Sequence, residues 1–477
     1  MKTPFYLTTT LPYVNADPHI GFALELVQAD TFARYHAQTG HDIFFNTGTD
    51  EHGLKIFRKA QELGIDPQEY CDTYAAKFND LKESLNLSYN HFIRTTDSHH
   101  KMAAQEFWKR CKESGDIYKK NYEVKYCVGC ELEKTDSELV DGYCPLHPNL
   151  EIELIDEENY FFKFSAFQDK LLRFYGENPD FVKPESKFHE IKNFVTAGLQ
   201  DFSISRLKSK MPWGVQVPDD EDHVMYVWFD ALINYISITG WPENTEEFEK
   251  WWGTSKKPNG IQVAGKDNLR QQSAMWQAML MSAKLPNSKQ IFIHGFVTAN
   301  GQKMSKSLGN VVNPLDMVQK WGTDSLRYYL LKEIPSLDDG DFSESRMAEV
   351  YNTDLANELG NLVMRLTTLG EKDGLHIEIP ENNEGNPYYK KFLESFEFNR
   401  ALEEIWKDIK VLNKSINDFE PWKKDAAARK EFLTTALIKL NHIATALLPF
   451  IPETAGKIII STSGTISKSV PLFPRVK

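Results

Sequence analysis

Apolar residues in the first fifty positions change their spacing in an order that is typical of an α/β domain. Residues 5–10 are mostly aromatic or β-branched and predict a strand, which Pro12 ends. Between His19 and about Gln38 the apolar positions recur at helical spacing, and Ile43 begins a second strand. This strand–helix–strand order puts the first loop at the carboxyl end of a strand, where open α/β sheets bind their ligands.

Short apolar runs return in the middle of the chain and predict further strands of the same sheet. They cover residues 224–230, 261–264 and 291–297, and a helix is expected from Ala231 onward. Together with the N-terminal unit, these runs predict a Rossmann-type, doubly wound parallel sheet that is built in two halves.

After Pro314 the pattern becomes helical. Long amphipathic stretches cover residues 352–369, 388–418 and 425–447, and prolines separate them. The pattern therefore predicts a C-terminal antiparallel α-helix bundle.

Three of the five cysteines lie close together, between the two halves of the predicted sheet. Cys127 and Cys130 form one C-x-x-C knuckle, and Cys144 and His147 form a C-x-x-H knuckle. Four such ligands fit a tetrahedral Zn²⁺ with no open position, so the predicted metal is structural. The alternative is a pair of coincidental turns.

These patterns divide the chain into five segments. We expect the two halves of a nucleotide-binding domain at residues 1–112 and 196–300, with a zinc-knuckle connective insertion at 113–195. A loop rich in lysine and a linking segment cover residues 301–345, and the helix bundle covers 346–477.

The bulk composition is that of an ordinary globular protein, and it excludes several classes. Of the 477 residues, 41% are hydrophobic and 26% are charged, and the formal net charge is −13. The acidic total argues against indiscriminate coating of DNA, although a local basic face would still bind nucleic acid. A signal-peptide pattern and an 18-residue apolar segment are both absent from the sequence, so we expect a cytoplasmic protein that does not enter a membrane.

Two stretches that lie far apart in the sequence carry residues suited to phosphate groups. His19 and Gly21 fall in the first turn of the predicted N-terminal helix, where free backbone N–H groups favour anions. Lys303, Ser305 and Lys306 lie in a loop between glycines and offer positive charge and a hydroxyl donor. Each stretch alone is also compatible with a structural role, as a helix cap or a solvated basic turn. Together they favour a polyphosphate site.

Asp50 lies in a polar cluster, residues 46–53, directly after the second predicted strand. Its carboxylate is suited to an ammonium group of a small molecule. The alternative is a capped turn that precedes the helix predicted at residues 54–63.

These motifs resemble those of a known family. Residues 18–22 (Pro-His-Ile-Gly-Phe) and 303–307 (Lys-Met-Ser-Lys-Ser) resemble the two signatures of class I aminoacyl-tRNA synthetases. Residues 11–15 and 49–53 narrow the resemblance to the methionyl-tRNA synthetase family, and it runs along nearly the whole chain. Phe22 stands where the first signature usually has histidine.

The resemblance implies ATP-dependent ligation of L-methionine to tRNA(Met) through a methionyl-adenylate, with ATP as its Mg²⁺ complex and a structural Zn²⁺ in the insertion. The insertion is shorter than the hydrolytic editing domain of the isoleucyl, valyl and leucyl relatives. A monomer is also implied, because the sequence stops soon after the bundle, without the dimerising domain of some family members.

The resemblance implies four groups of site residues. The catalytic residues are His19, Lys303 and Lys306. The ATP-binding residues are His19, Gly21, Gly265, Asp267, Lys303, Ser305 and Lys306. The methionine-binding residues are Leu11, Tyr13, Asp50, Trp228, Ala231, Tyr235 and Gln272. The residues for the tRNA anticodon are Asn361, Arg365 and Trp422.

Several of these assignments have an alternative interpretation. Gln272 stands where the family usually has a histidine, which leaves that polar contact to an amide or to water. The aromatic residues around Trp228 would be equally ordinary in a core, and Trp422 would be ordinary at the end of a bundle.

Two other functions are compatible with the motifs. The first is a class I synthetase for cysteine, whose pocket would use a thiolate-bound zinc, whereas here the four ligands lie together in the insertion. The second is an RNA-binding relative without activity, which would be expected to lose His19 or the signature lysines, and this chain keeps them.

Overall fold

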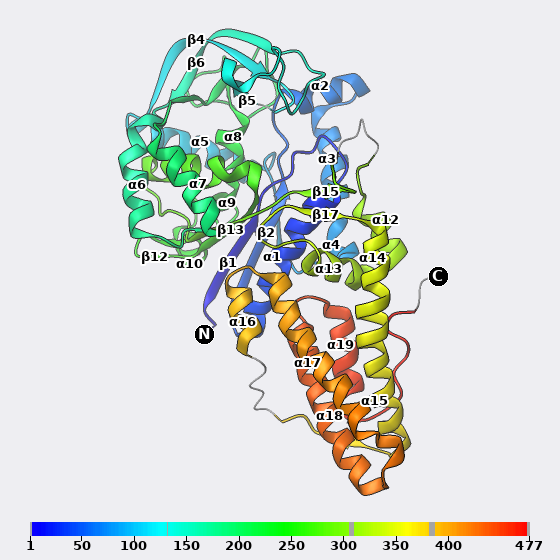
Figure 1. Cartoon of the computed structure of the whole chain (residues 1–477). Coiled ribbons are helices and arrows are strands. Elements are labelled where there is room, and N and C mark those ends of the chain that lie inside the picture. The colour runs from blue at the N-terminus through cyan, green and yellow to red at the C-terminus, as the bar shows by residue number, and fades with distance from the viewer. Residues whose placement is uncertain (1, 131, 305–309, 381–386, 475–477) are drawn as a thin grey trace. The chain divides into compact units, whose positions relative to one another are not determined.

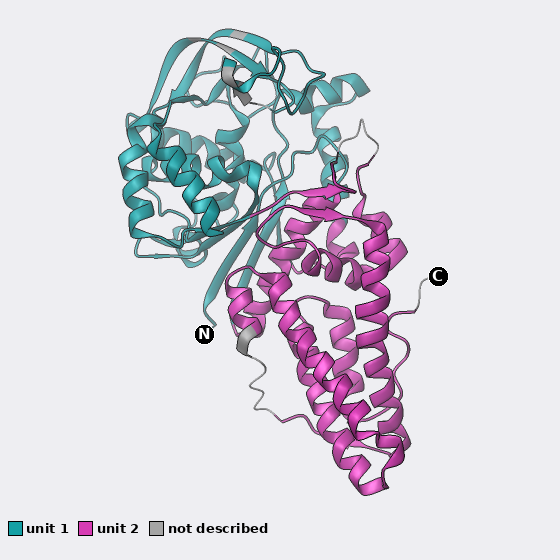
Figure 2. Ribbon diagram, viewed as in Figure 1, with its two compact units in different colours: residues 1–18, 41–80, 89–293 teal, residues 19–40, 81–88, 294–477 magenta. Residues whose placement is uncertain are grey.

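The computed structural model describes residues 2–130, 132–304, 310–380 and 387–474 (Figure 1). These residues form two compact units, each assembled from separate stretches of the chain (Figure 2). Unit 1 contains residues 1–18, 41–80 and 89–293, and unit 2 contains residues 19–40, 81–88 and 294–477. Among the described residues, no helix combines the length and the apolar character that a membrane crossing requires.

Unit 1 is built on a six-stranded sheet in the order β3-β2-β1-β13-β14-β7. The strands are β1 (Pro4–Thr9), β2 (Asp42–Thr49), β3 (His91–Arg94), β7 (Val182–Lys183), β13 (Gly260–Gly265) and β14 (Gln290–His294). The pairings β1–β2, β1–β13, β2–β3 and β7–β14 are parallel. The predicted α/β fold with a parallel sheet is therefore confirmed.

Helices of unit 1 contribute the large aromatic side chains of its core. They are α2 (Leu54–Leu63), α3 (Pro67–Asn79), α5 (Ser98–Glu113), α6 (Gln168–Glu177), α7 (Glu185–Thr196), α8 (Val227–Ala231), α9 (Asn234–Ser237), α10 (Thr245–Trp251) and α11 (Trp276–Ser282). Trp108, Trp252 and Trp276 are fully buried in one cluster with Tyr6 of β1. Aromatic rings of this size contribute much of the apolar area that stabilises a core.

A second sheet of unit 1 carries the cysteine cluster. Its order is β5-β4-β6-β8, with β4 (Ile117–Cys127), β5 (Leu132–Lys134), β6 (Glu153–Phe162) and β8 (Phe202–Ser203). The strands β4 and β6 pair antiparallel from Ile117 opposite Phe162 to Tyr126 opposite Glu153. Because β8 joins this sheet, the sheet extends beyond residue 195. The five-segment division of the chain stays a prediction.

Two strand predictions in unit 1 are wrong in their extent. In the run 224–230 the strand β10 covers only His223–Met225, and the chain then turns into α8, where the N–H groups of Phe229 and Asp230 donate to the Tyr226 carbonyl. The run 291–297 is divided between β14 and a strand of another sheet, β15 (Val297–Ala299). Apolar content alone does not separate a buried strand from a buried helical turn.

Unit 2 contains the N-terminal helix α1 (Ile20–Gln38) and the helical C-terminal half. Its other helices are α4 (Leu81–Ser84), α12 (Pro314–Trp321), α13 (Thr323–Lys332), α14 (Glu344–Val350), η6 (Tyr351–Gly360), α15 (Asn361–Lys372), α16 (Pro387–Glu394), α17 (Phe398–Phe419), α18 (Ala426–Leu447) and α19 (Pro452–Ser461). A small sheet joins β15 with β16 (Gln302–Lys303) and β17 (Gly340–Phe342). The predicted helical C-terminal region is confirmed, although the stretch expected at residues 388–418 is divided between α16 and α17.

A buried ion pair ties α1 to the C-terminal helices within unit 2. The Arg327 guanidinium on α13 lies 2.7 Å from the Asp30 carboxylate on α1, and both side chains are fully buried. Arg327 also donates to three backbone carbonyls, those of Leu85, Pro449 and Phe450. Burial alone would raise the pKa of Asp30, but Arg327, and then Arg34, lower it below its usual value.

Candidate active site and metal centre

His19 caps the N-terminus of α1 in a geometry that fixes its tautomer. Its backbone is extended, and its Nδ1 accepts a hydrogen bond from the Gly21 N–H at 3.1 Å. Burial lowers the pKa of His19, which favours the neutral ring. Because Nδ1 is the acceptor, the neutral ring carries its proton on Nε2 and presents it as a donor at the N-terminus of α1.

Gly21 leaves room for this arrangement. A β-carbon built on Gly21 would lie 3.0 Å from Cε1 and 3.1 Å from Nδ1 of His19. A side chain at residue 21 would therefore crowd the imidazole that folds back onto the helix terminus.

The loop that carries the lysines begins and ends beside the same helix terminus. The Ile20 N–H donates to the Val312 carbonyl at 3.0 Å, and a β-carbon built on Gly21 would lie 3.9 Å from the Met304 methyl group. The flanks of the loop therefore lie within unit 2 at the position of His19. Ser305 and Lys306 fall outside the described residues, and so does the side chain of Lys303.

In unit 1, the stretch around Tyr13 is bound to the end of β2. The Asp50 N–H donates to the Pro12 carbonyl at 2.9 Å, and the Val14 N–H donates to the Asp50 carbonyl at 3.2 Å. The Asp50 side chain is 8% exposed. Leu11 leads into this stretch and is partly buried.

Trp228 and Tyr13 pack against the same cluster of side chains. Both are partly buried and pack against a small cluster formed by Tyr126, Tyr226 and Val227. Ala231 follows on α8, and its carbonyl accepts from the Asn234 amide at 2.6 Å. The structure thus brings together Tyr13, Asp50 and Trp228, three residues that the sequence assigned to methionine.

A buried carboxylate that the sequence analysis missed holds α8 in place. One Asp230 oxygen lies 2.6 Å from His52 Nδ1, and the other lies 2.8 Å from His100 Nε2. Burial would raise the pKa of Asp230, but the two histidines lower it to about 2. The ionised carboxylate only accepts, so both imidazoles donate to it. A carboxylate at the end of the apolar run 224–230 was the one sequence signal that pointed to this arrangement.

Tyr235 and Gln272, two of the residues expected around methionine, contact each other directly. Gln272 lies on a turn of π-helix, η4 (Gln271–Met275), and its Nε2 donates to the Tyr235 hydroxyl at 2.7 Å. Both side chains are at most 2% exposed. Turns of π-helix occur often at functional sites.

Gly265 and Asp267 lie where a nucleotide-binding sheet would hold its ligand. Gly265 ends β13, and Asp267 lies in the short helix η3 (Lys266–Asn268) that follows. The strand β13 pairs in parallel with β1, so both strands end at the same edge of the sheet. This edge is where ligands bind in open α/β sheets.

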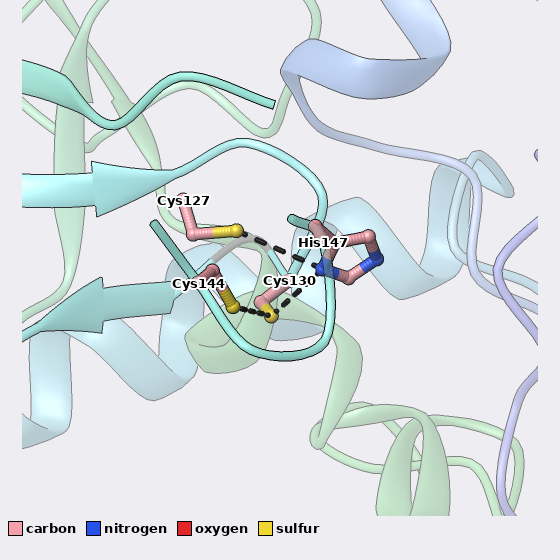
Figure 3. A group of neighbouring side chains, drawn as sticks. All are labelled: Cys127, Cys130, Cys144 and His147. Carbon is pink, nitrogen blue, oxygen red and sulfur yellow. Dashed lines mark hydrogen bonds between the residues drawn. The ribbon is translucent and has the colours of Figure 1, made fainter. Parts of the chain in front are cut away.

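Cys127, Cys130, Cys144 and His147 converge at the end of β4 (Figure 3). Their ligand atoms all lie within 4.8 Å of one another. The Cys130 sulfur lies 3.5 Å from the Cys144 sulfur and 3.2 Å from His147 Nδ1. These separations are close to the edges of a tetrahedron with Zn–S bonds of about 2.3 Å, and they are far from the S–S bond of about 2.05 Å in a disulfide. The residues therefore fit a structural Zn²⁺.

Gly129 provides the space that the histidine ligand occupies. A β-carbon built on Gly129 would lie only 2.5 Å from Cγ of His147. We expect Gly129→Ala to displace the imidazole and to lower zinc affinity by about 10- to 100-fold, as changes around metal ligands commonly do. Competition with a chromogenic chelator measures this affinity. Gly176→Ala is the matched control, because a β-carbon there would meet nothing within 4 Å, and unchanged zinc affinity of Gly129→Ala would contradict the expectation.

At the far end of the bundle, Arg365 and Trp422 lie together in unit 2. The Arg365 guanidinium lies 5.7 Å from the centre of the Trp422 ring and donates to the Asn417 amide oxygen at 2.8 Å. Trp422 is 52% exposed, so it is not a core residue of the bundle. Asn361 is exposed one helical turn before Arg365 on α15.

A parallel α/β sheet, a histidine-capped helix beside the signature loop, an inserted knuckle and a helical C-terminal region are together the architecture of a class I aminoacyl-tRNA synthetase. The family model described as tRNA synthetases class I (M) matches residues 5–151 and 147–367. The methionine–tRNA ligase of Thermotoga maritima is 42% identical over 476 residues, which cover 95% of this chain and 74% of the relative. The ligase of Nostoc sp. is 43% identical over 477 residues, which cover 95% of this chain and 89% of the relative.

A solved structure agrees with these relatives over the full length. The Mycobacterium tuberculosis methionyl-tRNA synthetase in complex with methionyl-adenylate superposes with a TM-score of 0.91 at 37% identity, and each chain is covered completely. The apo form of that synthetase gives a TM-score of 0.84. The chain belongs to the methionyl-tRNA synthetase family.

Proposed function

We propose that this protein ligates L-methionine to tRNA(Met) in two steps. In the first step the methionine carboxylate attacks the α-phosphate of ATP, which gives methionyl-adenylate and releases pyrophosphate. In the second step the 2′-hydroxyl of the terminal tRNA ribose attacks the acyl carbonyl and releases AMP. The observation that carries the proposal is the position of both flanks of the signature loop beside His19 at the N-terminus of α1.

The first step requires little acid–base chemistry from the protein, because the carboxylate is already a nucleophile. Positioning and stabilisation of the developing charge therefore supply most of the rate enhancement. His19 would donate from Nε2 to a phosphate oxygen at the positive end of the α1 dipole, and Lys303, Ser305 and Lys306 would contact the pyrophosphate. Mg²⁺ would accompany ATP and neutralise part of its charge.

The residues of unit 1 would hold the amino acid and the nucleoside. Asp50 would accept from the methionine ammonium group, while Tyr13, Trp228 and Ala231 would surround its side chain together with Leu11. A soft, unbranched thioether packs well against aromatic rings. Asp267, in the turn that follows Gly265, would accept from the ribose hydroxyls of ATP.

The exposed end of the bundle would read the anticodon. Unpaired bases are recognised by stacking on aromatic rings and by hydrogen bonds to their edges. Trp422 offers the ring, and Asn361 and Arg365 offer donors on one helix face next to it. Zn²⁺ bound by the knuckle would stabilise the insertion and would take no part in the chemistry.

Amino-acid-dependent exchange of label between ATP and pyrophosphate, with a panel of twenty amino acids, tests this function. We expect exchange with methionine at the lowest concentration. Exchange with cysteine alone, or with none of the twenty, would overturn the proposal. Gel filtration of the active protein tests the predicted monomer, and fractionation of cells tests the predicted cytoplasmic location.

A further inference from the structure

A buried carboxylate at Glu51 receives four hydrogen bonds within unit 1. Its side chain is 0% exposed. One oxygen accepts from the Thr49 hydroxyl and from Arg94 Nε, each at 2.6 Å, and the other accepts from Arg94 Nη2 at 2.9 Å and from the Thr96 hydroxyl. Burial would lower the pKa of Arg94, but Glu51, and then Asp72, raise it, which favours the charged pair. The two-fold contact with the guanidinium fixes both the position and the plane of the carboxylate.

The backbone of Glu51 is bonded as completely as its side chain. Its N–H donates to the Thr95 hydroxyl at 2.9 Å. Its carbonyl accepts from Trp213 Nε1 at 2.5 Å and from the Cys71 thiol at 3.5 Å. Because Asp50 shares a peptide bond with Glu51, these contacts also hold the Asp50 backbone from one side.

Other hydrogen bonds hold Asp50 from the remaining directions. Its N–H donates to the Pro12 carbonyl, and its carbonyl accepts from the Val14 N–H. Two positions after Asp50, the His52 imidazole donates to the Asp230 carboxylate at 2.6 Å. Each of the residues 50–52 is therefore fixed by contacts to a different part of unit 1, and a rotation of the chain at Asp50 would break several of them.

We propose that Glu51, together with Arg94, is a positioning residue that places the Asp50 carboxylate against the ammonium group of the substrate. This inference rests on the proposed function, in which Asp50 accepts from the methionine ammonium group. The polar atoms of Glu51 are bonded to the protein, so Glu51 acts through Asp50 and does not bind the substrate itself. A buried ion pair often adds little net stability compared with apolar side chains of the same volume, and placement of the chain gives this pair a role that apolar residues would not fill.

The test compares two competitive inhibitors of methionine-dependent ATP–pyrophosphate exchange. The first is L-methioninol, which carries the ammonium group, and the second is the same alcohol with hydrogen in place of that group. Glutamine at position 51 has a single oxygen and cannot accept all four hydrogen bonds. We therefore expect Glu51→Gln to raise the inhibition constant of methioninol by about tenfold, as a displaced hydrogen bond to a charged group does. The constant of the alcohol without the ammonium group should stay unchanged.

A second variant changes the same network without altering its charge. Thr96→Val keeps the shape of the side chain and removes one donor to Glu51, so it should raise the constant of methioninol by about threefold and leave that of the other alcohol unchanged. Glu157→Gln on β6 is the matched control, because its carboxylate is also buried and lies 3.0 Å from a lysine, Lys210. It should change neither constant.

The outcomes separate the two levels of the proposal. If the wild-type protein does not exchange label with methionine, the proposed function is wrong. If it does, but Glu51→Gln and Thr96→Val bind methioninol as the wild type does, the positioning role is wrong. An equal loss of affinity for both alcohols would also overturn it, because that result indicates a general loss of packing. If Glu51→Gln does not fold, the two constants measured with Thr96→Val decide.

Discussion

His19→Asn should slow methionine-dependent ATP–pyrophosphate exchange by about 10- to 150-fold, the cost of one hydrogen bond to a charged group. Asparagine is a good N-cap, so its Oδ1 can accept from the Gly21 N–H as the imidazole does. It lacks the Nε2–H donor, which the imidazole holds further from the backbone. We therefore expect the rate to fall while the melting temperature and the KM for methionine stay near their wild-type values.

Two further variants separate the cap from the phosphate contact. His19→Ala should lower both the exchange rate and the stability of α1, whereas Lys306→Ala should lower only the exchange rate. Normal exchange by His19→Asn would contradict the assignment of Nε2 to a phosphate.

The dependence of stability on pH adds an independent check on His19. Burial lowers the pKa of His19, so folding favours the neutral ring. The stabilising cap is then fully present above the unfolded pKa of about 6.5 and is lost as the pH falls below it.

Arg327→Met should destabilise unit 2 by about 3–5 kcal/mol, which is the usual cost of breaking a buried ion pair by removal of one member. The substitution keeps much of the side-chain volume but removes the charge that faces Asp30. It also leaves the carbonyls of Leu85, Pro449 and Phe450 without the donor that serves all three. The midpoint of urea denaturation measures the change.

Arg34→Met is the matched control for this prediction. Arg34 also contacts Asp30, at 2.7 Å, but its side chain is 23% exposed, so water can replace much of the contact. We expect a loss of about 1 kcal/mol for this variant. The double variant Asp30→Asn with Arg327→Met should be more stable than Arg327→Met alone, because it removes a buried charge that has lost one of its two arginine partners. An Arg327→Met variant as stable as Arg34→Met would show that the buried pair contributes little.

The sequence predicted the features of the fold and of the site that depend on residues close together in the chain. The strand, loop and helix around His19 lie within forty residues, and the spacing of the cysteines and the histidine indicates a tetrahedral metal site. Both features were therefore predicted from the sequence alone. The strand predicted in the run 224–230 was too long, because the turn into α8 involves contacts with residues that are distant in the sequence. Asp230 bonds to His52, 178 residues earlier, and to His100, 130 residues earlier.

Gln272 shows the same limit in the site itself. From the sequence it was a departure that removed a histidine, and its partners were unknown. In the structure its side-chain amide accepts from Gln262 of β13, and its backbone carbonyl accepts from Gln277 of α11. A glutamine at position 262, inside an otherwise apolar buried strand, was the one visible sign that a polar partner was needed there.

The helix α1 joins the two features on which these predictions depend. His19 caps one end, Asp30 lies in its middle, and Gln38 near its other end donates to the Thr445 carbonyl of α18. From His19 to Asp30 a helix rises roughly 16 Å, and a helix bends far less easily than a loop. Through Arg327, the same helix that presents the imidazole is therefore bound directly to the backbone at Pro449 and Phe450.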